Sequence, residues 1–120
     1  MSLQLNGLLM LYFDSQLKSF AQINTYLNTV TVLQSPETKL SYYSLYHDKT
    51  KNQVYLAGGI ELASNKTSKK VLKYDVQTNK WTEMPEMLEA RKQPTLYVSD
   101  GCLIARCGNA NGTEEAFDME

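Results

Sequence analysis

Short apolar runs separated by polar segments make up most of the chain. The runs are rich in Tyr, Leu, Thr and Val, which favour half-buried β-structure, so each run predicts a strand. The predicted strands are Leu8–Phe13, Leu40–Tyr46, Gln53–Ala57, Val71–Tyr74, Lys80–Met84, Thr95–Ser99 and Cys102–Cys107. No stretch of ten or more residues keeps apolar residues at helical spacing, and the nearest, Met84–Ala90, contains Pro85. The pattern predicts an all-β fold.

Polar turns join neighbouring strands as hairpins. Asp48–Asn52 and Asp100-Gly101 each lead from one predicted strand into the next, and Asp75–Asn79 joins another pair. The double glycine Gly58-Gly59 ends an apolar strand, where it removes side chains from a point of close backbone packing or positive φ.

An apolar run that ends in an aromatic residue followed by Asp occurs three times. The three pairs are Phe13-Asp14, Tyr74-Asp75 and Phe117-Asp118, at intervals of 61 and 43 residues. A large aromatic residue, Phe20 or Trp81, stands six residues after the Asp of the first two pairs.

A second pattern is the apolar strand that ends in a pair of glycines. Gln53–Gly59 carries it fully, and Cys102–Gly108 repeats it 49 residues later with Cys107 in place of the first Gly. A period of this length suits a repeat in which each unit is a small four-stranded sheet.

The order and spacing of these residues resemble the kelch repeat. The residues that carry the resemblance are Gly58, Gly59, Tyr74, Asp75, Trp81, Met87, Arg91 and Gly108. The resemblance implies a partial kelch β-propeller of about two four-stranded antiparallel blades. It divides the chain into a degenerate partial repeat and linker at 1–39, a well-matched region at 40–108 and the start of a further repeat at 109–120.

The repeats depart from the family pattern in three ways. The linker Asn24–Lys39 is longer than its second copy and has no counterpart of Arg91, and Arg106-Cys107-Gly108 lacks the double glycine. Propellers close with roughly four to eight blades, so we expect the chain to be a fragment or short form of a longer kelch protein. On its own it would expose sheet edges, which favours self-association.

Composition and charge exclude several classes of function. Hydrophobic residues make up 42% of the chain and the net charge is −1, so no field of one sign attracts nucleic acid or an anionic membrane. The run Leu8–Phe13 is too short to span a bilayer and lacks the basic flank of a signal peptide. We therefore expect a strand in a cytoplasmic or nuclear protein, and cytoplasmic is the location that we favour.

The sequence offers no metal, cofactor or catalytic constellation. Cys102 and Cys107 are too few for a structural zinc site, and they are interpreted as small strand hydrophobes. His47 is predicted to be a solvated turn residue without acid–base partners. Copper oxidases that share the propeller need two His, and this chain has one, so no enzyme is expected. Asn65-Lys66-Thr67 and Asn111-Gly112-Thr113 match the glycosylation pattern but are interpreted as unmodified turn residues.

Two polar loops are the candidates for binding. Ile60–Lys70 and Met84–Pro94 resemble the kelch loops that grip peptide segments of partner proteins. The candidate contact residues are Asn65, Lys66, Ser68, Lys69, Arg91 and Lys92. The alternative, that Arg91 braces the neighbouring loop and that the lysines are merely solvated, stays open.

The resemblance implies a module that binds other proteins. Many kelch proteins join their propeller to a BTB domain and recruit substrates to cullin-RING ubiquitin ligases, so we expect such an adaptor. Nothing in the 120 residues resembles a BTB domain, and the role therefore comes by implication alone. The alternatives are an actin-binding or cytoskeletal scaffold, and a truncated fragment without function.

Overall fold

The computed structural model describes residues 2–6, 9–13, 20–24, 27–33, 36–109 and 111–118. Over these residues the chain forms strands, turns and loops, and no helix is long and apolar enough to cross a membrane. The predicted all-β fold is confirmed.

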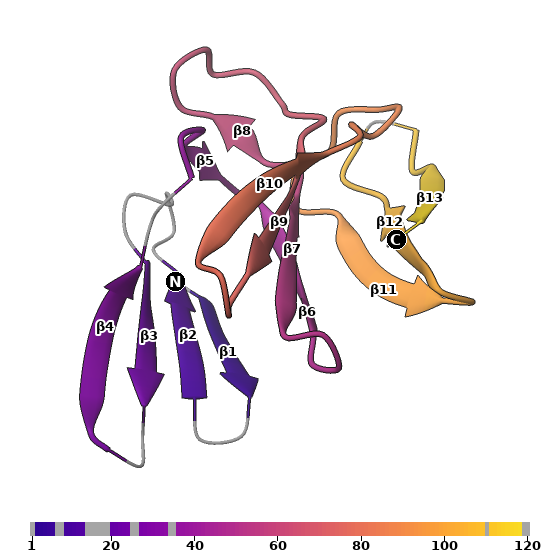
Figure 1. Cartoon of the computed structure of the whole chain (residues 1–120). Coiled ribbons are helices and arrows are strands. Elements are labelled where there is room, and N and C mark those ends of the chain that lie inside the picture. The colour runs from indigo at the N-terminus through magenta and orange to yellow at the C-terminus, as the bar shows by residue number, and fades with distance from the viewer. Residues whose placement is uncertain are drawn as a thin grey trace.

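The first sheet is a four-stranded antiparallel meander. Its order is β1-β2-β3-β4, and its strands are β1 (Ser2–Asn6), β2 (Leu9–Phe13), β3 (Phe20–Asn24) and β4 (Thr29–Leu33). Figure 1 shows this sheet beside the second one, with β4 at its outer border.

The second sheet is also four-stranded and antiparallel, in the order β10-β9-β7-β6. Its strands are β6 (Ser44–Asp48), β7 (Gln53–Ala57), β9 (Val71–Asp75) and β10 (Lys80–Met84). A two-stranded ribbon, β5 (Leu40–Ser41) with β8 (Ile60–Glu61), lies next to it.

The third sheet has three strands, β11 (Thr95–Ser99), β12 (Cys102–Arg106) and β13 (Glu114–Asp118). The described chain therefore holds the two expected four-stranded sheets and three strands of another, side by side (Figure 1). This arrangement agrees with a partial propeller.

Pairing registers confirm the repeat seen in the sequence. Phe13 pairs with Phe20 across β2 and β3, as Tyr74 pairs with Trp81 across β9 and β10. Four of the five β2–β3 pairs, from Met10–Ile23 to Phe13–Phe20, have counterparts in the β9–β10 register at the 61-residue interval. β12 likewise follows β7 at 49 residues, and β13 follows β9 at 43.

Asp side chains close the hairpin turns of the second sheet. Asp48 Oδ1 accepts the backbone N–H of Thr50 at 3.1 Å, and Asp75 Oδ1 accepts that of Gln77 at 2.9 Å. Both turns end at an Asn with positive φ, Asn52 at 53° and Asn79 at 55°. The polar turns predicted at Asp48–Asn52 and Asp75–Asn79 are confirmed, and Asp hydrogen bonds and left-handed Asn residues form them.

Three expectations are corrected. Leu40–Tyr46 is not one strand, because Tyr42 has a φ of 56° and separates β5 from β6. The segment 24–39 is not simply a linker, because it contains β4. His47 lies within β6 and pairs with Val54, so it is not a turn residue.

The core forms two clusters of buried side chains. One fills the second sheet with Leu40, Val54, Leu56, Leu72 and Tyr74, and Leu33 of β4 packs against it. The other joins the second and third sheets through Ala57, Val71, Met87 and Ala105. Met87 comes from the connection between the sheets and is 2% exposed.

Candidate functional site

The long connections of the second sheet gather at one end. Figure 1 shows the β5–β8 ribbon and the loop after β8 at this end, and the tight β6–β7 and β9–β10 turns at the other. Hydrogen bonds bring further connections to the same place: Gln93 N–H donates to Tyr42 O at 2.8 Å and Lys92 N–H to Gly108 O at 2.7 Å. We call residues 36–43, 60–70, 85–94, 107–109 and 111–113 the loop end.

The double glycine fastens the loop end to the blade-like sheet. Gly59 N–H donates to Arg91 O at 2.8 Å, and Gly58 N–H donates to Lys70 O at 3.0 Å. A Cβ on Gly58 would lie 2.4 Å from Arg91 O, so any side chain would separate the two segments. Ser68 is tied to the same point, because its N–H donates to Gly59 O at 2.7 Å.

Arg91 connects this point to the third sheet. Its guanidinium donates to Cys107 O at 3.0 Å and to Thr113 O at 2.6 Å, and its Nη2 lies 3.1 Å from Glu115 Oε2. The Arg91 side chain is 1% exposed and that of Glu115 is 12% exposed. A buried cation is tolerable only when paired and hydrogen-bonded, which is the case here.

Glu115 is the partner that sequence reasoning missed. Its carboxylate also accepts the backbone N–H of Leu88 at 2.6 Å and of Glu89 at 3.2 Å, so it holds the whole connection against β13. Glu89 in turn accepts hydrogen bonds from Asn109 and Thr113. Arg91 and Glu115 are 24 residues apart, and no local pattern pairs them.

The candidate contact residues divide into two groups. Asn65, Lys66, Lys69 and Lys92 are exposed, as a binding role requires. Ser68 and Arg91 are buried, at 2% and 1% exposure, so the expected partner contact at these two residues is corrected. The alternative left open for Arg91, bracing of a neighbouring segment, is the one that its geometry supports.

Tyr42 is a surface residue that the sequence did not single out. Its side chain is 51% exposed, and its φ of 56° is rare for a bulky residue. Lys92 Nζ lies 4.4 Å from the centre of the Tyr42 ring, a cation–π contact. A strained, half-exposed aromatic residue is a typical feature of binding surfaces. Only the double Tyr42-Tyr43 inside a predicted strand hinted at it.

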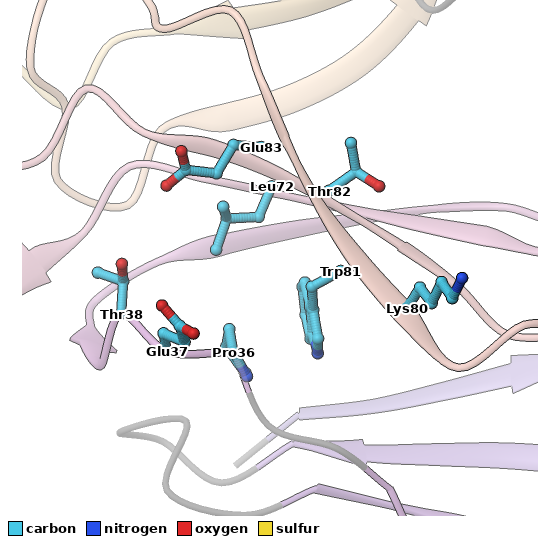
Figure 2. A pocket seen from close by; sticks show the side chains of 8 residues that line it. All are labelled: Pro36, Glu37, Thr38, Leu72, Lys80, Trp81, Thr82 and Glu83. Atoms are coloured by element: carbon cyan, nitrogen blue, oxygen red, sulfur yellow. The ribbon is translucent and has the colours of Figure 1, made fainter.

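A pocket of about 440 Å³ lies between the segment before β5 and strand β10. Figure 2 shows Lys80 and Trp81 on one side of it and Pro36, Glu37 and Thr38 on the other. Its wall mixes apolar side chains with charges of both signs, which selects no single class of ligand.

The Tyr74–Trp81 pair is part of the second sheet's packing. The ring centres are 5.0 Å apart, and Tyr74 is fully buried. Its hydroxyl donates to Asn79 Oδ1 at 2.5 Å, so Tyr74 ties the sheet to its own turn. Burial, with a smaller effect of the Asp75 charge, raises the pKa of Tyr74 to about 12.

The described residues provide no grouping of three or more His, Cys, Asp or Glu that would hold a metal ion. Cys102 and Cys107 are both free thiols. Cys107 lies beyond β12 with a φ of 65°, so it is not the strand residue that the sequence predicted. It occupies the left-handed position that Gly58 takes in the second sheet.

Comparison with known families decides what this architecture is. A family model described as the kelch motif matches residues 50–88, which include the double glycine, Tyr74-Asp75, Trp81 and Met87. The chain carries a kelch repeat. The match covers three strands of the second sheet, β7, β9 and β10, and kelch repeats generally mediate binding to other proteins. No curated protein matches the chain as a relative.

Proposed function

We propose that the loop end binds an acidic segment of a partner protein. The observation that carries this proposal is a fixed set of connections that turn basic and aromatic side chains outward. Lys66 and Lys69 are exposed and form no ion pair with any residue that the structure describes. Cations of this kind complement carboxylates of an extended peptide.

The blade gives these side chains a rigid support. The double glycine, Arg91 and Glu115 fix the connections by buried hydrogen bonds, so little ordering entropy remains to be lost on binding. Tyr42 and Lys92 add an aromatic anchor with a cation above its ring. Aromatic anchors of this type contribute much of the energy in protein interfaces.

Within this proposal, the chain serves substrate recognition in a cytoplasmic adaptor of a cullin-RING ubiquitin ligase. The support is the kelch motif together with the exposed lysines of the loop end. The role is one of binding, and the partner protein supplies any catalytic step.

Selection from a phage library of random dodecapeptides tests the binding proposal. We expect wild-type protein to enrich sequences that combine acidic and apolar residues, and the K66E/K69E variant to lose that enrichment. The matched control is K49E/K51E, which makes the same charge change at the opposite end of the blade. Equal enrichment by K66E/K69E and wild type would refute an acidic partner at the loop end.

Tyr42→Gly provides a second, sharper variant. Gly relieves the positive φ and removes the exposed ring, so we expect unchanged or higher stability together with at least tenfold weaker binding of the selected peptides. Stability gained at the expense of binding is the signature of a residue kept for recognition. Undiminished peptide binding by Tyr42→Gly would remove Tyr42 from the site.

The ligase role has its own test. Affinity capture from cells of the longest gene product that contains this chain should recover a cullin scaffold. Co-sedimentation with actin filaments, and no cullin, would favour the cytoskeletal alternative instead.

A further inference from the structure

Strand β4 is an addition to the repeat. By the 61-residue register, β3 corresponds to β10, which is the border strand of the second sheet. β4 pairs with β3 beyond that position, so the first sheet carries a strand that the second sheet lacks. It lies in the segment Asn24–Lys39, which makes the first interval between aromatic–Asp pairs, 61 residues, longer than the second, 43 residues.

The added strand leaves apolar side chains in solvent. Val30 is 66% exposed and Val32 is 78% exposed, whereas Leu33 on the opposite face packs against the core of the second sheet. Burial within the described chain therefore accounts for an apolar side chain at Leu33. It does not account for apolar side chains at Val30 and Val32. No described strand pairs with the outer edge of β4.

This edge has none of the usual protection against pairing. Edge strands are generally guarded by charges, Pro or bulges, and Thr29–Leu33 has neither a charge nor a Pro. Among the other border strands of the described chain, β10 carries Lys80 and Glu83 and β13 carries Glu114, Glu115 and Asp118, whereas the border strands β1 and β11 are uncharged like β4.

The sequence of β4 is complementary to itself. In an antiparallel pair centred on Thr31, Val30 stands opposite Val32 of the second copy twice, and Thr31 stands opposite Thr31. Val–Val and Thr–Thr pairs across strands are favourable, and no like charges meet. The same pairing of β13 would place Glu114 opposite Asp118, which repels.

We propose that β4 is a dimerisation strand that pairs with β4 of a second copy of this chain. The two first sheets then form one continuous eight-stranded sheet across a twofold axis, an isologous and therefore closed assembly. Because the contact is only five residues long, its area is small and the dimer is weak. This dimer does not depend on the proposed binding of acidic peptides.

Analytical ultracentrifugation of the full chain over a concentration series tests the dimer. We expect the mass to rise from 13.6 kDa towards twice that value, and no further, as concentration increases. The V30K/V32K and V30E/V32E variants each place like charges opposite one another, so each should raise the dissociation constant about tenfold or more. Both replaced side chains are exposed, so the fold should survive, which circular dichroism checks.

An equimolar mixture of V30K/V32K and V30E/V32E is the decisive test of the proposed pairing. In the proposed register every Lys faces a Glu of the other variant, so the mixture should form the dimer that neither variant forms alone. The control L62K/L88K adds two lysines at exposed leucines of the loop end and should leave the dimer intact. A wild-type monomer at all concentrations, species larger than a dimer, no recovery in the mixture, or dissociation by L62K/L88K alone would each overturn the proposal.

Discussion

At the scale of single residues, buried polar groups tie the sheets to their connections and turns. Arg91 and Tyr74 are both almost completely buried, and each satisfies its polar atoms with partners from the connections or turns. Such groups stabilise only while their partners remain, because an orphaned buried group keeps its desolvation cost. Loss of one partner should therefore destabilise the fold more than the intact pair stabilises it.

Replacement of Arg91 by Met should lower the free energy of unfolding by about 3–5 kcal/mol, since it leaves Glu115 buried beside an uncharged side chain. Urea unfolding followed by circular dichroism measures the loss. Lys70→Met is the control, because the Lys70–Glu83 pair is exposed and should contribute about 0–1 kcal/mol. Similar losses in the two variants would contradict a special role of the buried pair.

Tyr74 should make stability fall at alkaline pH. Its pKa is raised to about 12 in the folded chain, above the unfolded value of about 10. The folded state therefore keeps this contribution below pH 10 and loses it as the pH rises to about 12. Burial also raises the pKa of Tyr55, which acts in the same direction.

The measurement is the urea midpoint of wild type and Tyr74→Phe at increasing pH. We expect the advantage of wild type to shrink above about pH 10, because Phe has no proton to lose. A constant difference between the two proteins across this range would show that Tyr74 does not ionise on unfolding.

At the scale of elements, close approach of strand and connection fixes the blade. Gly58 follows β7 at the point where the connection 85–94 returns, and the two segments share backbone hydrogen bonds. The third sheet keeps the counterpart of the Gly58–Lys70 hydrogen bond with Cys107 in the left-handed position, since Cys107 N–H donates to Thr113 O at 2.9 Å. The contact is thus a property of the repeat and not of one residue type.

Gly58→Ala and Gly101→Ala separate steric crowding from backbone strain. The φ angles are nearly equal, +74° and +76°, but a Cβ on Gly58 meets Arg91 O at 2.4 Å, whereas one on Gly101 meets nothing within 4 Å. Gly58→Ala should therefore cost about 1–3 kcal/mol more in unfolding free energy than Gly101→Ala. Equal costs in denaturant unfolding would mean that the connection yields to the added methyl group.

At the scale of the whole molecule, the described contacts between neighbouring sheets include Met87 and Leu33. Met87 enters the cluster shared by the second and third sheets, and Leu33 of β4 contacts the core of the second sheet. Stability in such repeats is carried by contacts between neighbouring units as well as within them.

Met87→Ala should weaken the contact between the second and third sheets, at a cost of about 2–5 kcal/mol. We expect amide hydrogen exchange to accelerate more in β11–β13 than in β7 and β9, because the second sheet keeps its own core. Leu88→Ala is the control, since Leu88 is 80% exposed and should change stability by at most about 0.5 kcal/mol. Uniform acceleration in all strands would indicate a single cooperative unit.

The sequence by itself determined most strands of the second and third sheets, the hairpin turns of the second sheet and the spacing of the repeat. Alternating apolar residues, Asp turns and the double glycine act over a few neighbouring residues, so their effects are readable from local pattern. The 61-residue repeat seen in the sequence is matched by the pairing of Phe13 with Phe20 and of Tyr74 with Trp81. The exposed lysines of the loop after β8 were also predicted, because residues 64–70 are continuously polar.

Only the tertiary structure decided which of these residues remain accessible. Arg91 and Ser68 look like surface residues in the sequence, but the return of distant segments buries them. Glu115 gains its role from β13, which the fold places beside the connection 85–94. The exposure of the Tyr42 ring and the pairing of β4 with β3 were likewise visible only in the folded chain. The physical reason is that burial and ion pairing between distant segments depend on the path of the whole backbone, which no local pattern records.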